Sequence, residues 1–117
     1  MTRSMPSKVE PFDGEEVRYS RPASRAQHAR RAVGGRLYVT NRRVLFCPHA
    51  VDAALAGEYW WVEHSAIRGL GRAERNYRAL HAGGLRRRLR IELVGGDVEL
   101  FVINKLDQVI AEIRAAA

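Results

Sequence analysis

The sequence predicts a mainly β domain: a barrel of about seven antiparallel strands with one C-terminal α-helix. Two observations support this prediction. Short segments in which apolar and polar residues alternate follow one another along most of the chain, with glycine, proline, asparagine or aspartate between them. Only the last segment, residues 105 to about 115, has its apolar residues at helical spacing.

Length and composition indicate one globular domain. A chain of 117 residues can bury roughly two-thirds of its unfolded surface, and 46% hydrophobic with 28% charged residues is typical of a folded protein. No apolar run approaches the ~20 residues of a membrane-spanning helix, and residues 1–16 lack the apolar centre of a signal peptide. We therefore expect a cytoplasmic protein, including one held peripherally at a membrane.

The N-terminal region gives the weakest signal. Residues 1–12 hold little to bury and are predicted to form a mobile arm, with the folded domain spanning residues 13–117. A first strand is expected over residues 17–24, although Pro22 would confine it to a sheet edge or a bulge. Residues 25–31 are either the start of a second strand or a basic loop leading to it.

The clearest strand signal lies in residues 34–47. Two alternating runs, Leu37-Tyr38-Val39-Thr40 and Val44-Leu45-Phe46-Cys47, flank the polar tripeptide Asn41-Arg42-Arg43. Asparagine tolerates positive φ, so the tripeptide is expected to form the turn of a β-hairpin. The two arginines should then face solvent at its tip.

An aromatic strand is predicted over residues 59–63, after an alanine-rich loop or helical turn at residues 51–57. Alternation puts Trp60 and Val62 on one face, and Trp61 and Glu63 on the other. A turn at residues 64–66 leads into a further strand over residues 67–73.

Two more strands and a helix complete the chain. After a polar loop at residues 74–84, residues 85–94 alternate so that Leu89, Ile91 and Leu93 face the core while Arg86, Arg88 and Arg90 project into solvent. Residues 95–97 form a tight turn, and the partner strand over residues 98–103 is expected to point Val98, Leu100 and Val102 inward.

The predicted C-terminal helix begins after Asn104, an N-cap residue with Asp107 three positions later. Its single apolar stripe consists of Leu106, Val109, Ile110 and Ile113. A helix of about eleven residues is marginal alone, so it should dock over an open end of the barrel.

The run Gly-Arg-Leu-Tyr-Val-Thr-Asn-Arg-Arg-Val-Leu-Phe at residues 35–46 resembles the central hairpin of GRAM domains, a branch of the pleckstrin-homology-like superfamily. The resemblance extends over roughly residues 33–113 through Trp60-Trp61-Val62, Ile67, Leu89-Arg90-Ile91 and the final helix. It departs from the family pattern at Ala66, where an aspartate is common, and at Glu63 or His64, where a proline is usual. It implies a pleckstrin-homology-like barrel that binds phosphoinositides, other anionic lipids or proteins.

No catalytic, cofactor or metal site is predicted, so we expect neither an enzyme nor a small-molecule substrate. The four histidines lie far apart in the sequence, and Cys47 is the only cysteine. His49 falls on the same strand face as Cys47, but two ligands do not make a zinc site. Cys47 is expected to be a small apolar residue on its strand.

The formal net charge of +7, carried almost wholly by arginine, favours an anionic partner, although abundant arginine and alanine are also what a GC-rich genome encodes. The candidates for binding an anion or lipid headgroup are Arg42, Arg43, Arg86, Arg88 and Arg90, because the planar guanidinium suits phosphate. The alternative is a solvated basic face whose arginines pair with acids such as Glu92 and Glu99.

The tryptophan pair gives the second candidate surface. An outward Trp60 or Trp61 could insert at a membrane interface or anchor a protein partner, unless it packs under the 51–57 loop or the N-terminal arm. The function expected first is therefore a module that binds an anionic membrane surface or lipid headgroup. The alternative is a protein-interaction or self-assembly domain with an open strand edge. Nucleic-acid binding comes third, because aromatic residues do not interleave with the arginines.

Overall fold

Seven strands form one antiparallel sheet that wraps around the core, in the order β4-β3-β2-β1-β7-β6-β5. The computed structural model describes residues 5–6, 8–28, 31–49, 58–74 and 87–117. Its strands are β1 (Val17–His28), β2 (Arg31–Thr40), β3 (Arg43–Pro48), β4 (Trp60–Glu63), β5 (Ile67–Ala73), β6 (Arg88–Leu93) and β7 (Val98–Ile103). A short 3-10 helix η1 (His64–Ala66) joins β4 to β5, and the chain ends in helix α2 (Leu106–Ala116).

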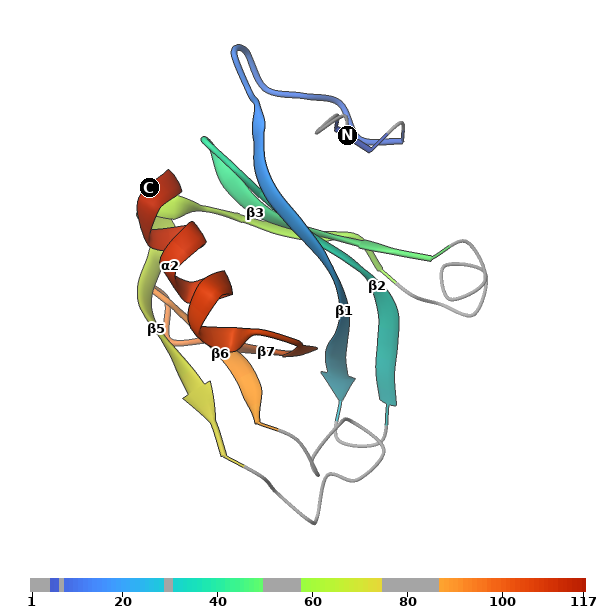
Figure 1. The fold of residues 1–117 in the computed structure, drawn as a ribbon, viewed down its shortest axis with the longest axis vertical. Coiled ribbons are helices and arrows are strands. Elements are labelled where there is room, and N and C mark those ends of the chain that lie inside the picture. The colour runs from blue at the N-terminus through green and yellow to red at the C-terminus, as the bar shows by residue number, and fades with distance from the viewer. Residues whose placement is uncertain (1–4, 7, 29–30, 50–57, 75–86) are drawn as a thin grey trace.

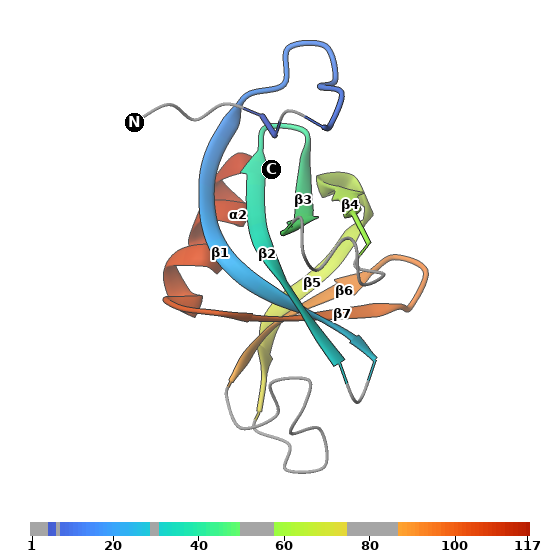
Figure 2. The ribbon, with the colours of Figure 1, turned by 90° about the vertical axis from the view of Figure 1, so that its right-hand side faces the viewer.

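The order of the strands closes the sheet into a barrel-like shape with two free edges. Strands that are consecutive in sequence are neighbours except β4 and β5, and β1 pairs with both β2 and β7 and so links the two halves. Strands β5 to β7 cross the direction of β1 to β3 steeply, and α2 covers one side of the barrel between β1 and β5 (Figures 1 and 2). Strands β4 and β5 end the sheet, so each has one edge without a strand partner in the described chain.

The core lies between the curved sheet and α2. Phe101 is at its centre, with its ring centroid 5.7 Å from that of Phe46 and 5.5 Å from that of Trp60. The helix contributes Val109, Ile110 and Ile113, which confirms the predicted apolar stripe. Other large buried side chains include Leu37, Val39, Val44, Leu89 and Ile91.

Several predictions from the sequence are confirmed by these elements. The hairpin of β2 and β3 pairs Leu37 with Phe46 and Val39 with Val44, as the alternation required. In β4, Val62 is buried and Trp61 is exposed, so the two faces were assigned correctly. The loop predicted at residues 51–57 lies outside the described residues, as does the 74–84 loop apart from Glu74.

Strand β1 is longer than predicted. It continues through residues 25–28 and pairs with β2 along its length, so most of the uncertain basic segment belongs to this strand. Pro22 is tolerated because the pairing of β1 with β7 begins only at Ala23.

The predicted inner face of β7 is wrong by one residue. Phe101 and Ile103 are buried, whereas Val98 is 40% exposed and Leu100 and Val102 are only partly buried. Five of the six residues in this strand are apolar, so alternation could not identify the core side. Pairing decides it, because Phe101 lies opposite the buried Leu89 of β6.

The predicted N-cap is also wrong. Helix α2 begins at Leu106, and the capping position is occupied by Lys105 with a left-handed backbone (φ 57°) and no side-chain capping hydrogen bond. Asn104 therefore precedes the cap, because the chain needs the left-handed residue to turn from β7 into the helix. None of the helices in the described part of the chain is long and apolar enough to cross a membrane.

The revised inner face of β7 can be tested by truncating one residue on each side. Phe101→Ala should lower the free energy of unfolding by about 3–5 kcal/mol, the cost of removing a fully buried phenylalanine. Val98→Ala should change it by less than about 0.5 kcal/mol, as for an exposed site. Urea denaturation measures both, and a Val98 variant as damaging as the Phe101 variant would contradict the assignment.

Candidate functional site

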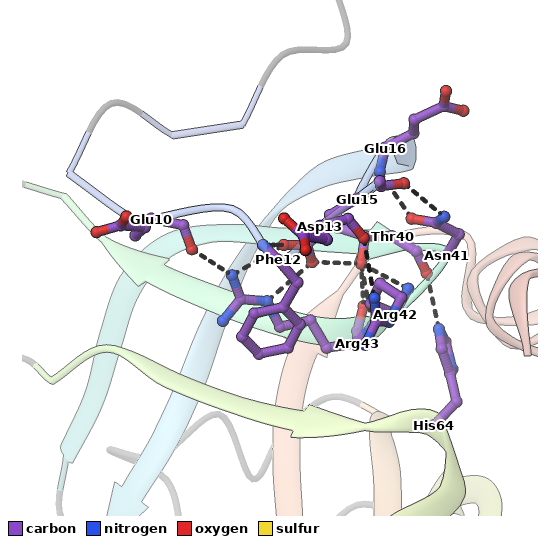
Figure 3. Close-up of polar contacts among 11 residues, drawn as sticks. Glu10, Phe12, Asp13, Glu15, Glu16, Thr40, Asn41, Arg42, Arg43 and His64 are labelled. Atoms are coloured by element: carbon purple, nitrogen blue, oxygen red, sulfur yellow. Dashed lines mark hydrogen bonds and ion pairs between the residues drawn. The ribbon is translucent and has the colours of Figure 1, made fainter.

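Arg43 and Glu15 form a buried ion pair at the base of the β2–β3 turn. Arg43, the first residue of β3, is only 2% exposed. Its Nε donates to Glu15 Oε2 at 2.8 Å and its Nη2 to Glu15 Oε1 at 3.0 Å, so the pair is bidentate (Figure 3). Such a fork-to-carboxylate contact is among the strongest side-chain interactions in proteins.

The Glu15 carboxylate receives two further hydrogen bonds. Thr40 Oγ1 donates to Oε2 at 2.7 Å, and the backbone N–H of Phe12 donates to Oε1 at 2.9 Å. Burial alone would raise the pKa of Glu15, but the hydrogen bonds from Arg43, Phe12 and Thr40 outweigh it and hold this pKa below its ordinary value. The carboxylate is therefore ionised at neutral pH.

Residues 10–16, which we call the N-terminal strap, are fastened to the hairpin by backbone contacts as well. The carbonyl of Glu10 accepts from Arg43 Nη2 at 3.0 Å, and that of Asp13 accepts from Arg42 Nη1 at 2.9 Å. Asn41 donates through Nδ2 to the carbonyl of Gly14 at 3.0 Å, and its Oδ1 accepts from the N–H of Glu16 at 2.7 Å (Figure 3). The strap thus follows the turn on its outer side.

Aromatic rings enclose the Arg43 guanidinium. Its carbon lies 4.0 Å from the ring centroid of Phe12 and 5.1 Å from that of Trp61. The two rings meet edge to face at 5.3 Å. Phe12, assigned to a mobile arm from the sequence, packs here against the hairpin.

The expectation that both hairpin arginines face solvent is therefore wrong for Arg43. Its donors are directed at the strap because Glu15, far away in the sequence, supplies a carboxylate beside it. Arg42 is exposed but also donates to the strap. Arg43 thus donates to a carboxylate and a carbonyl of the strap, and one nitrogen of Arg42 donates to a carbonyl of the strap.

The arginines of β6 are placed differently from one another. Arg88 was expected in solvent but is 4% exposed, because its Nη2 reaches back to the carbonyl of Glu74 at 3.1 Å. Its Nε has no hydrogen-bond partner among the described residues. Arg90 is partly exposed and lies 3.6 Å from a carboxylate oxygen of Glu92. Arg86 lies outside the described residues.

The four described candidate arginines do not gather at one place. The β2–β3 turn that holds Arg42 and Arg43 lies at one end of the molecule, and β6 begins with Arg88 at the opposite end (Figures 1 and 2).

The tryptophans have different surroundings. Trp60 is partly buried and contacts Phe101 on the inside of the barrel, with the guanidinium of Arg25 5.6 Å from its ring centroid. Trp61 points outward and is 46% exposed. Its ring meets that of Phe12 edge to face and still leaves nearly half of the tryptophan exposed.

Cys47 is a buried strand residue, as expected, and burial raises the pKa of its thiol to about 11. His49 is exposed at the end of the same hairpin arm. In the part of the chain that the structure describes, no three histidine, cysteine, aspartate or glutamate side chains are grouped as metal ligands.

A groove between β5 and α2 was not predicted from the sequence. It contains a cavity of about 260 Å³ whose apolar walls are Ile67, Leu70 and Ile113. Arg68 and Arg114 line the same cavity, together with His64. The only local signal was a short strand with glycines and arginines, because the second wall comes from helix α2, which begins more than 30 residues after β5 ends.

Charged and polar groups define the ends of this groove. At the start of α2, Arg72 forms an ion pair with Asp107. Near the cavity, Arg68 Nη2 lies 3.1 Å from a carboxylate oxygen of Glu92, and Arg114 has no ion-pair partner among the described residues. His64 donates through Nε2 to the carbonyl of Thr40 at 2.7 Å, and its buried Nδ1 has no partner in the described chain.

Comparison with known proteins identifies the fold. No protein-family model matches this sequence, and no curated protein sequence does. The C-terminal domain of an unknown protein from Leishmania infantum matches with a TM-score of 0.67 at 11% identity, over 89% of this chain and 85% of that one. The Vps36 N-terminal PH domain matches with a TM-score of 0.60 at 12% identity, over 92% of this chain and 83% of that one.

Seven antiparallel strands followed by a C-terminal helix, together with the similarity to a PH domain, define a pleckstrin-homology-like fold. The predicted fold class is confirmed. Membership of the GRAM branch remains a prediction from the hairpin residues.

The ion pair predicts a specific dependence of stability on pH. Glu15→Gln should lower the free energy of unfolding by about 3 kcal/mol at pH 7, because it leaves a buried guanidinium uncompensated. The folded pKa of Glu15 is depressed, so its contribution is complete above the ordinary carboxyl pKa of about 4.3 and is lost as pH falls further.

Urea denaturation between pH 7 and pH 3 measures the free energy of unfolding of the wild type and of Glu15→Gln. The difference between the two should decrease only below about pH 4.3. Glu16→Gln is the matched control, because its exposed carboxylate forms an exposed ion pair with Arg18 at 3.4 Å, and it should change stability by less than about 1 kcal/mol. A difference in the free energy of unfolding that does not change with pH would contradict the assigned role of Glu15.

Cys47 should be unreactive while the domain is folded. Because the thiol is buried and its pKa is raised, alkylation by iodoacetamide at pH 8 should be at least about a hundredfold slower in the native protein than in urea. Mass spectrometry of timed samples measures both rates, and similar rates would show that the strand opens easily.

Proposed function

We propose that this domain is a protein-interaction module that binds an extended segment of a partner along the free edge of β5. The observation that carries this proposal is the cavity of about 260 Å³ that is walled by α2 and lies beside a strand edge that no described strand pairs with. Adding a strand to an exposed edge uses main-chain hydrogen bonds for affinity and pockets for side-chain specificity. The groove supplies both.

Strand β5 suits this role better than the other free edge. It has seven residues, whereas β4 has four, and Trp61 on β4 is in contact with Phe12 of the strap. Another cavity, of about 230 Å³, lies over β1, β2 and β7 near Ser24 and Asn104. None of these three strands ends the sheet, and the cavity lies where the short pairing of β1 with β7 stops.

The arginines give less support to a lipid headgroup site. A headgroup site built from the predicted arginines needs several of their guanidinium groups to converge on one anion. Among the described candidates, Arg43 is compensated by Glu15, Arg88 is buried, and Arg42 lies at the opposite end of the molecule from the start of β6. We therefore favour the protein-interaction alternative.

Charge on β5 also favours a different protein over a second copy of this chain. Fully overlapped antiparallel pairing of two β5 strands would be centred on Leu70. That register places Arg68 opposite Arg72 of the other copy at both ends, and like charges directly opposite each other destabilise a strand pair.

A peptide selected from a random display library against the full chain provides the test. When the peptide is added, the amide resonances of the domain that change in chemical shift should belong to β5 and α2. Leu70→Trp should abolish binding by filling the cavity, and Leu70→Met should retain it because the side-chain volume is conserved.

Both variants should keep a cooperative thermal transition, which shows that they fold. Perturbations confined to β4 or to the β2–β3 hairpin would overturn the assignment to β5. Binding of the selected peptide that is unchanged in folded Leu70→Trp would overturn it as well.

A further inference from the structure

The β5–α2 groove carries more positive than negative charge. Arg68 and Arg72 lie on β5 and Arg114 on the last turn of α2. Asp107 compensates Arg72, but Glu92 is shared between Arg68 and Arg90, with distances of 3.1 and 3.6 Å to its carboxylate. Within the described chain Arg114 has no acidic partner, so the cavity end of the groove lacks at least one negative charge.

The cavity itself is apolar beneath these cations. Ile67, Leu70 and Ile113 line it, and its volume of about 260 Å³ is ample for one side chain, since a protein cavity of about 150 Å³ already holds a benzene ring. An apolar group and a carboxylate can thus be accommodated side by side, one within the cavity and one at its rim.

The backbone of β5 is irregular between Ile67 and Gly69, so the regular two-residue alternation is broken at Arg68. Leu70 lies opposite the buried Ile91 and lines the cavity, while Arg68 lines the same cavity and pairs with Glu92. A residue in the cavity and a residue at Arg68 are therefore close together on an added strand, at a spacing that regular alternation does not set.

We infer that the partner segment is acidic, with an apolar residue in the cavity and, close to it along the segment, an aspartate or glutamate that pairs with Arg114 and Arg68. This inference rests on the proposed function and names the chemistry of its ligand. The carboxylate of the partner supplies a negative counter-charge for Arg114. It shares the guanidinium of Arg68 with Glu92. The bound segment thus completes a charge network on the edge of the sheet.

Three capped peptides of about seven residues, the length of β5, are suitable probes. Each has a central valine flanked on both sides by glutamate, by glutamine or by lysine, and they are otherwise identical. Titration into the labelled full chain, followed by NMR, gives a dissociation constant for each. The glutamate peptide should bind at β5 and α2 most tightly, and the lysine peptide most weakly.

Charge reversal identifies the residues responsible. Arg114→Glu should weaken binding of the glutamate peptide about fivefold to tenfold, as expected when a half-exposed ion pair becomes a repulsion. The matched control is Arg87→Glu, which changes the net charge equally but lies next to Glu74, beyond the other end of β5. It should alter binding less than twofold, and Arg114→Gln should give an intermediate loss.

The outcomes separate this inference from the proposed function. Equal affinity for the glutamate and glutamine peptides at β5 would overturn the acidic specificity and leave strand addition standing. If neither these probes nor the selected peptide changes the NMR resonances of β5, the acidic specificity and the proposed function are both wrong. Sedimentation with anionic vesicles at ~0.15 M salt, if abolished by Arg114→Glu but not by Arg87→Glu, would assign the arginines to a membrane surface and overturn the peptide assignment.

Discussion

The Arg43–Glu15 ion pair determines how one end of the molecule is organised. Around this pair the strap, the β2–β3 turn and β4 come into contact, through Phe12, Thr40 and Trp61. Buried ion pairs add little net stability compared with apolar packing, but breaking one is expensive. The pair therefore fixes the position of the strap more than it strengthens the fold.

This network extends towards the groove. Thr40 Oγ1 donates to Glu15, while the carbonyl of Thr40 accepts from His64, and His64 lines the cavity between β5 and α2. One hydrogen-bonded residue thus separates the ion pair from the candidate binding site. Because β4 and η1 are short, this contact helps to position the start of β5, on which the free edge depends.

Local periodicity was sufficient to predict the hairpin, the aromatic strand and the apolar stripe of the helix, because each pattern is set within a few residues. It could not give the inner face of β7, where nearly every side chain is apolar, or the burial of Arg43, whose partner is 28 residues away. The groove was missed for the same reason, since its walls are distant in sequence. Counting arginines predicted an anionic ligand, but their positions and partners decide where that charge is available.

Hydrogen exchange of the β5 amides, with and without a bound acidic peptide, would test strand addition at this edge most directly. In the free domain, alternate amides of β5 face no strand and should exchange rapidly, while those bonded to β6 are protected. Strand addition predicts that the peptide slows exchange of the unprotected set and leaves β4 unchanged. Protection on β4 or the strap, with β5 unaffected, would contradict it.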